Sequence, residues 1–136
     1  MNVRHVVRGA ALVVLLAVAG CHREPEPVTV AKAFATAMQQ RDAKALLPFL
    51  DARARKRLEE AAERATDQIG GRRQVGTYEM LQVVDVDPRF QVARATLVDS
   101  SETTATVRLD GVDGSEHVLT LLREDGEWHV RLPIPP

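Results

Sequence analysis

The fold is decided near the C-terminal end of the chain, in residues 119–132, which read LTLLREDGEWHVRL. Asp125-Gly126 stands between two runs rich in apolar residues, and this pair is typical of a two-residue type I′ hairpin turn. The turn fixes the register of the two strands, so alternate side chains lie opposite one another on one face. The pairs on that face are Arg123 with Trp128, Leu121 with Val130 and Leu119 with Leu132. Because this face is largely apolar, we expect it to point into the core.

The same alternation puts the two histidines of this region on opposite faces of the sheet. His117 falls on the inner face, whereas His129 points outward beside Leu122 and Arg131. We therefore expect that these histidines do not meet at one metal ion.

Three residues of the inner face form the candidate pocket, namely His117, Arg123 and Trp128. A functional interpretation makes them a polar corner of an apolar cavity, able to orient an anionic or amphiphilic ligand. The structural alternative stacks Arg123 on Trp128 near the sheet edge and leaves His117 hydrogen-bonded at the start of a strand.

Upstream of the hairpin, further extended runs are separated by turn residues at regular intervals, which predicts an antiparallel meander. The expected strands are Phe90–Val98, Glu102–Leu109, Ser115–Arg123 and Glu127–Leu132. The joints between them are Ser100-Ser101, residues 110–114 and Asp125-Gly126. Residues 77–86 have two interpretations, because Met80, Val84 and Val86 alternate as in a strand while Thr77 is suited to cap a short helical turn.

The first part of the domain has helical periodicity, with apolar residues on one side of the segment 28–40. The polar residues on its other side include Lys32, Thr36 and Gln39. Asp42 is placed to cap a short second helix, and Asp51 a third helix that runs through Ile69 to Gly70-Gly71. The buried stripe expected on the third helix consists of Ala54, Leu58, Ala61, Ala65 and Ile69. Helices at about 28–69 followed by strands at about 77–132 predict an α+β domain.

The first 21 residues have the features of an export signal. Arg4 and Arg8 precede an apolar run of about ten residues, too short to span a bilayer. The run ends in Val18-Ala19-Gly20-Cys21, which resembles the lipobox of bacterial lipoproteins, where the cysteine is lipidated and the chain is cut before it. The alternative is an ordinary secreted protein with a free thiol.

The lipobox divides the chain into a signal peptide at 1–20, a lipidated Cys21 with a short Pro-rich tether through residue 27, and one domain at 28–136. His22 follows the cysteine, where an aspartate would retain a lipoprotein in the inner membrane. We therefore expect a lipid-anchored protein of the bacterial cell envelope, on the periplasmic face of the outer membrane if the source has two membranes.

Charge and motif content exclude several classes of function. Loss of Arg4 and Arg8 with the signal leaves 16 basic against 19 acidic side chains, which is no footprint for nucleic acid. The chain lacks the spacings of zinc sites, serine-nucleophile elbows and phosphate loops, so we expect no cofactor, no metal site and no catalytic residues. The acidic segment 110–114 hints at calcium but is better explained as a hairpin loop.

One cluster of basic residues opens the third helix, at Arg53, Arg55, Lys56 and Arg57. It suits either contact with anionic lipid headgroups or a solvated helix face with ion pairs four residues apart. Interleaved acidic residues favour the second interpretation.

Two short stretches suggest a family. Val30-Ala31-Lys32-Ala33-Phe34 leading to Arg41-Asp42-Ala43, and the closing Glu124-Asp125-Gly126-Glu127-Trp128-His129-Val130, resemble the nuclear-transport-factor-two-like superfamily, in particular its small secreted members of unknown function. The resemblance implies helices packed on the concave face of a curved antiparallel sheet, a conical pocket, and often dimerisation through the sheet.

The resemblance fixes no activity, because this fold hosts both enzymes and non-enzymes. Ketosteroid isomerases need a tyrosine and two aspartates in an apolar site, and Tyr78 is the only tyrosine here. Cyclases of this fold use an inward histidine and aspartate, yet His117 has no assignable partner and Glu116 points to the other face.

We therefore expect a non-enzymatic interaction or accessory module, with another envelope protein as partner and a homodimer as a further option. The alternatives are a carrier of a small amphiphilic molecule and, less favoured, an isomerase-like or cyclase-like enzyme. A cone filled by Phe34, Phe49, Leu121 and Val130 would indicate a scaffold, and a hollow cone would indicate a carrier.

Overall fold

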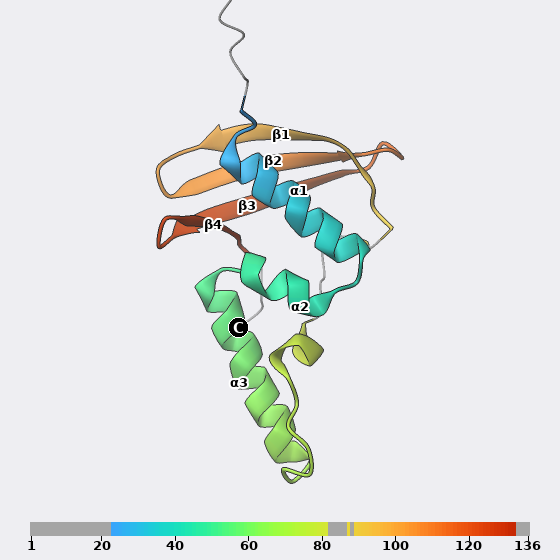
Figure 1. The fold of residues 1–136 in the computed structure, drawn as a ribbon, viewed down its shortest axis with the longest axis vertical. Helices are drawn as coiled ribbons and strands as arrows, with labels where there is room; N and C mark the ends of the chain where they lie inside the picture. The colour runs from blue at the N-terminus through green and yellow to red at the C-terminus, as the bar shows by residue number, and fades with distance from the viewer. Residues whose placement is uncertain (1–22, 82–86, 88, 133–136) are drawn as a thin grey trace, which may run out of the picture.

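The structure, a computed structural model, describes residues 23–81, 87 and 89–132. Its helical elements are α1 (Glu26–Gln39), α2 (Ala43–Leu46), η1 (Leu47–Phe49), α3 (Ala52–Gln68) and η2 (Thr77–Met80). Its strands are β1 (Val92–Ser100), β2 (Thr104–Gly111), β3 (Glu116–Glu124) and β4 (Glu127–Val130). Helices followed by a curved antiparallel sheet confirm the α+β class (Figure 1). The signal peptide, Cys21, and the alternating Val84 and Val86 lie outside the described residues.

The sheet is the expected meander, with strand order β1-β2-β3-β4 and antiparallel neighbours. Asp125 and Gly126 have φ values of 52° and 86°, as a type I′ turn requires. The ladder contains two of the three expected pairs, Arg123 with Trp128 and Leu121 with Val130. The third pair is not formed as a ladder pair, because β4 ends at Val130.

The core lies between α1 and the inner face of the sheet, where α1 crosses in front of the strands (Figure 1). The buried residues of α1 are Pro27, Val28, Ala31, Phe34, Ala35, Ala37 and Met38. Those of the strands are Ala105, Val107, Leu109, Leu119, Leu121, Trp128 and Val130. The apolar face predicted for the first helix therefore packs against the apolar face predicted for the sheet.

The ends of α1 and α2 follow local rules. Helix α1 begins at Glu26 with Pro27 in its first turn, so the expected tether loses its last two residues to the helix. Asp42 caps α2 as expected, because its Oδ1 accepts a hydrogen bond from the Ala45 N–H at 3.0 Å.

Residues 77–80 form a 3-10 turn, which favours the helical interpretation for that part of the ambiguous segment.

The sequence predicted the C-terminal end of α3 but not the hydrogen bond at its N-terminal end. Gly70 and Gly71 end the helix as expected, with φ values of 68° and 66°. Asp51 occupies the N-cap position but its carboxylate makes no cap bond. Glu124 of the distant hairpin accepts the Ala52 N–H instead, at 2.9 Å.

Helix α3 does not lie on the sheet, contrary to the expected stripe. Its fully buried residues are Ala54, Leu58 and Ala62, whereas Ile69 is 41% exposed. The helix extends away from the sheet with η2 beside it, toward the end of the molecule opposite the start of α1 (Figure 1). The physical reason is that α1 already covers the inner face, and a stripe of alanines buries too little apolar area to compete for it.

Candidate functional site

The three residues of the predicted pocket do not converge. His117 and Arg123 lie six positions apart on β3, which corresponds to about 20 Å along an extended strand. Arg123 lies over Trp128, with its guanidinium carbon 5.8 Å from the ring centroid, and its Nε–H donates to the Gly126 carbonyl at 3.3 Å. Arg123 and Trp128 therefore brace the hairpin, at the opposite end of the strand from His117.

His117 packs against an aromatic ring. Its imidazole lies edge-to-face on Phe90, with 4.5 Å between ring centroids, and the side chain is half-buried. The exposed Asp113 lies near enough for the histidine to contribute to lowering its pKa, but the main cause is the Ser115 hydroxyl, which donates to its Oδ1 at 2.5 Å. The Asp113 carboxylate is thus fixed by hydrogen bonds within its own turn and does not pair with His117.

His129 pairs with Leu122 in the ladder, on the face opposite Trp128 and Val130 as expected, but it is not directed into solvent. The side chain is only 9% exposed, and its Nδ1 lies 3.1 Å from the Pro48 carbonyl oxygen. The reason is that the chain around η1 runs beside β4, where Leu50 forms a parallel bridge with Val130. Within the described ranges, no group of three or more His, Cys, Asp or Glu side chains is placed to hold a metal ion.

The interior that the sequence proposed as a pocket is filled at its centre. Phe34, Leu121 and Val130 are at most 1% exposed, and Phe49 is half-buried against them. The rings of Phe34 and Phe49 meet edge-to-face with 6.5 Å between centroids. These four side chains therefore occupy the space that a carrier would keep open.

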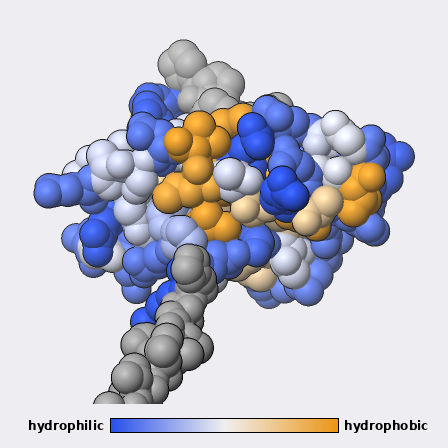
Figure 2. Space-filling view, turned by 90° about the horizontal axis from the view of Figure 1, so that it is seen from above, coloured by the Kyte–Doolittle hydropathy of each residue, from blue (hydrophilic) through white to orange (hydrophobic). Residues whose placement is uncertain are grey.

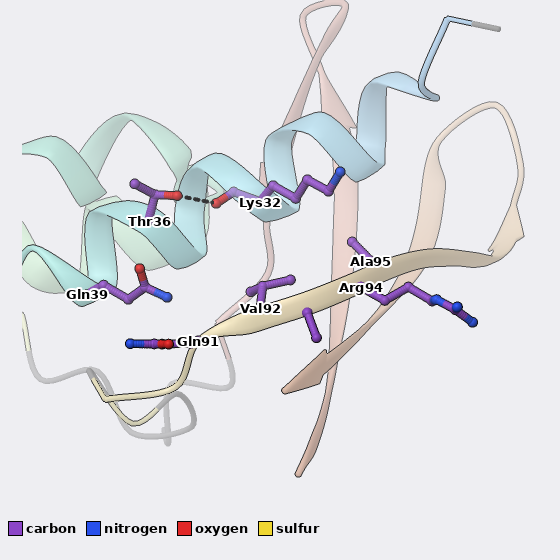
Figure 3. A pocket seen from close by; sticks show the side chains of 8 residues that line it. Lys32, Thr36, Gln39, Gln91, Val92, Arg94 and Ala95 are labelled. Carbon is purple, nitrogen blue, oxygen red and sulfur yellow. Dashed lines mark hydrogen bonds between the residues drawn. The ribbon is translucent and has the colours of Figure 1, made fainter. Parts of the chain in front are cut away.

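A groove of about 620 Å³ lies instead on the surface, between α1 and the edge strand β1 (Figure 3). Its lining residues are Lys32, Thr36, Gln39, Gln91, Val92, Ala93, Arg94 and Ala95. The two charged residues among them, Lys32 and Arg94, are both basic. Val92 and Ala95 point toward α1, whereas the Arg94 side chain runs along the strand (Figure 3).

Local features of α1 and β1 build this groove. The polar side of α1 faces it, and Gln39 ties the helix to the approach of β1 by donating its Nε2–H to the Phe90 carbonyl at 2.6 Å. Strand β1 has register shifts between Val92 and Arg94 and between Leu97 and Asp99, and such bulges twist a strand and redirect its side chains. Sequence reasoning placed the helix residues in solvent and missed the groove, since only the tertiary fold brings β1 beside them.

Lys32 is partly engaged within the chain. Its ammonium pairs with Glu24, which also accepts a hydrogen bond from Thr29 at 3.2 Å. The hydrogen bond from Lys32 holds the pKa of Glu24 below its ordinary value. Lys32, on the α1 side of the groove, is thus already paired with a carboxylate of its own chain.

A second site of electrostatic interest is the buried carboxylate of Asp51. Asp51 is 4% exposed, and its Oδ1 has no hydrogen-bond partner. Burial raises the pKa of Asp51 above its ordinary value and the Glu124 carboxylate raises it further, against an opposing hydrogen bond from the Leu132 backbone. The ionised form of Asp51 is therefore disfavoured in the native state.

We expect Asp51→Asn to increase the free energy of unfolding at pH 7 by more than the ~0.5 kcal/mol typical of surface changes. The native pKa of Asp51 lies above its unfolded value of about 3.9, so the contribution of its protonated form to the free energy of unfolding is fully present below about pH 3.9. It is lost as the pH rises toward the native pKa. The advantage of Asp51→Asn should therefore vanish near pH 3 and grow toward neutrality, as measured by urea unfolding at several pH values.

The same substitution at Asp42 is the control, because asparagine and aspartate cap a helix about equally well. Glu24, Glu79, Asp87 and Asp113 have lowered pKa values and act in the opposite direction, so the difference from the parent chain isolates Asp51. An Asp51→Asn chain that is less stable than the parent at pH 7 would contradict the expectation.

Comparisons of this chain with protein-family models, with curated proteins and with solved structures gave no match. Among the residues that the structure describes, no helix combines the length and the apolar character needed to span a bilayer.

Proposed function

We propose that this chain is a lipid-anchored, non-enzymatic docking module of the bacterial cell envelope, which binds another envelope protein at the groove between α1 and β1. The observation that carries the proposal is the surface groove itself, which lies beside the edge strand β1 of the described sheet and has only basic charged residues in its lining. We also propose that the domain is a member of the nuclear-transport-factor-two-like superfamily, with the conical arrangement of helix and sheet that the resemblance implies.

The filled interior favours docking over transport of a small molecule. Phe34, Phe49, Leu121 and Val130 occupy the centre of the fold, and burying a ligand there would require displacing them. A protein partner needs no internal cavity, because interfaces use surface edges and grooves.

The proposed anchor brings the groove close to the membrane. Glu26, where α1 begins, is five positions after Cys21, and an extended Pro-containing segment spans about 3.1 Å per residue. The tether is therefore about 15 Å long, and Lys32 lies fewer than two turns into the helix. A partner of this groove is expected at the same membrane.

Site-specific photocrosslinking in the producing cell tests the proposal. We expect a photoreactive residue at Gln91, in the groove, to give one discrete crosslinked product with an envelope protein, and the same residue at Gln68, at the far end of α3, to give none. The product from Gln91 should be lost when Arg94 is changed to glutamate. Products from Gln68 alone would move the interface to α3 and overturn the proposed site.

Native mass spectrometry of the mature chain in detergent tests the carrier alternative. We expect a mass that is accounted for by the polypeptide and its acyl chains. A further mass that is reproducible between preparations would favour a carrier and would identify the class of its ligand.

A further inference from the structure

Resting on the proposed docking function, we infer that the occupant of the groove is an extended protein segment with acidic side chains, which pairs with β1 as a fifth strand of the sheet. Three observations carry this inference: the contrast between the two sheet edges, the charge of the groove, and the apolar side chains beside it.

The two edges of the sheet are treated differently by the fold. At β4, the chain before α3 covers the edge, through the Leu50–Val130 bridge and a hydrogen bond from the Asp51 N–H to the Val130 carbonyl at 3.1 Å. At β1, no strand of the described residues pairs on the side away from β2. A nine-residue strand of this kind offers alternate backbone N–H and C=O groups to a further strand.

The charge of the groove selects an acidic occupant. Arg94 supplies this charge, because Lys32 on the α1 side is already paired with Glu24 and the remaining lining residues are uncharged. Arg94 stands opposite Asp110 in the ladder, yet the Asp110 carboxylate forms its ion pair with Arg108 at 3.1 Å. Within the described part of the chain, Arg94 forms no ion pair and is open to a carboxylate from outside.

The same charges argue against a second copy of this chain as the occupant. Antiparallel pairing of β1 with its own copy uses one patch twice, related by a two-fold axis. In the register that sets Arg94 opposite its own copy, two guanidinium groups would face one another, and like charges directly across paired strands are destabilising. An acidic segment from another protein would instead place negative charge opposite the positive charge of the groove, which is favourable.

The groove also has an apolar component. Val92 and Ala95 point toward α1 (Figure 3), and seen from above, where β1 is nearest, apolar side chains form a narrow band in a largely hydrophilic surface (Figure 2). Because Val92 and Ala95 face α1 while the Arg94 side chain runs along the strand, the matching segment combines apolar side chains toward α1 with acidic side chains toward Arg94, and alternation of the two is its simplest pattern.

The test uses a synthetic decapeptide that alternates glutamate with valine or threonine, titrated into the isotope-labelled mature chain in detergent micelles. We expect the backbone amide signals of residues 91–97 to shift. The matched peptide with glutamine for glutamate should bind at least tenfold more weakly. Arg94→Glu should also weaken binding of the acidic peptide at least tenfold, while the control Arg53→Glu, an exposed residue of α3, should leave binding unchanged.

Several results would overturn the inference. They are no binding of the acidic peptide at millimolar concentration, equal binding of the two peptides, insensitivity to Arg94→Glu, and shifts confined to residues outside β1 and α1. Shifts of 91–97 that depend on protein concentration without peptide would identify a second copy as the occupant. A crosslink from Gln91 together with failure of the peptide would refute the acidic strand while leaving the docking function standing.

Discussion

Replacing Phe34 with alanine is expected to remove about 3–5 kcal/mol from the free energy of unfolding. Phe34 is 1% exposed and lies at the centre of the core, against Phe49 and the inner face of the sheet. Alanine would lose the transfer free energy of the ring and leave a cavity that the rigid sheet cannot close. Since a domain of this size has about 5–15 kcal/mol in total, the substitution would remove a large share of its stability.

Urea unfolding followed by the fluorescence of Trp128, the only tryptophan, measures the effect. Thr36→Ala on the exposed side of the same helix is the matched control and should change the unfolding free energy by less than ~0.5 kcal/mol. Phe49→Ala should cost less than Phe34→Ala, because Phe49 is only half-buried. Equal effects of the three substitutions would mean that the interior is not packed around Phe34.

Changing Cys21 to serine is expected to abolish acylation of the chain. Serine has no thiol to receive a diacylglyceryl group, so no acyl chain can be attached at this position. Each buried methylene of an acyl chain contributes about 0.8 kcal/mol to membrane binding, and two or three chains together give a lasting anchor. Incorporation of labelled palmitate in the producing cell, with the mass of the mature N-terminal peptide, measures the outcome.

His22→Ala is the control, because it leaves the thiol and the preceding small residues intact. It should keep the label. A Cys21→Ser chain that still incorporates palmitate would contradict the proposed anchor, as would a mature parent chain whose N-terminal peptide carries an unmodified thiol.

Local signals predicted the elements that depend on neighbours in the chain. The Asp125-Gly126 turn set the β3–β4 register, Asp42 capped α2, and Gly70-Gly71 ended α3, because each of these acts within a few residues. The strand order followed from short joints, which leave antiparallel neighbours as the simplest arrangement.

Features that depend on distant residues could not be predicted in this way. His129 is buried by Pro48, 81 positions away, and the α3 cap comes from Glu124, 72 positions from Ala52. The groove likewise combines the polar side of α1 with a strand that begins at Val92. Periodicity indicates which side of an element is apolar, but it does not say which other element comes to lie on its polar side.

The bond between Glu124 and Ala52 has a consequence for the order in which the chain completes its fold. Helix α3 is made of local contacts, yet the acceptor for its first N–H and the Val130 carbonyl that fixes Asp51 both belong to the last strands. Synthesis runs from the N-terminus, so these groups emerge after α3. The start of α3 therefore relies on water for these hydrogen bonds until the C-terminal hairpin has closed, and a chain truncated before Glu124 would lack both protein acceptors.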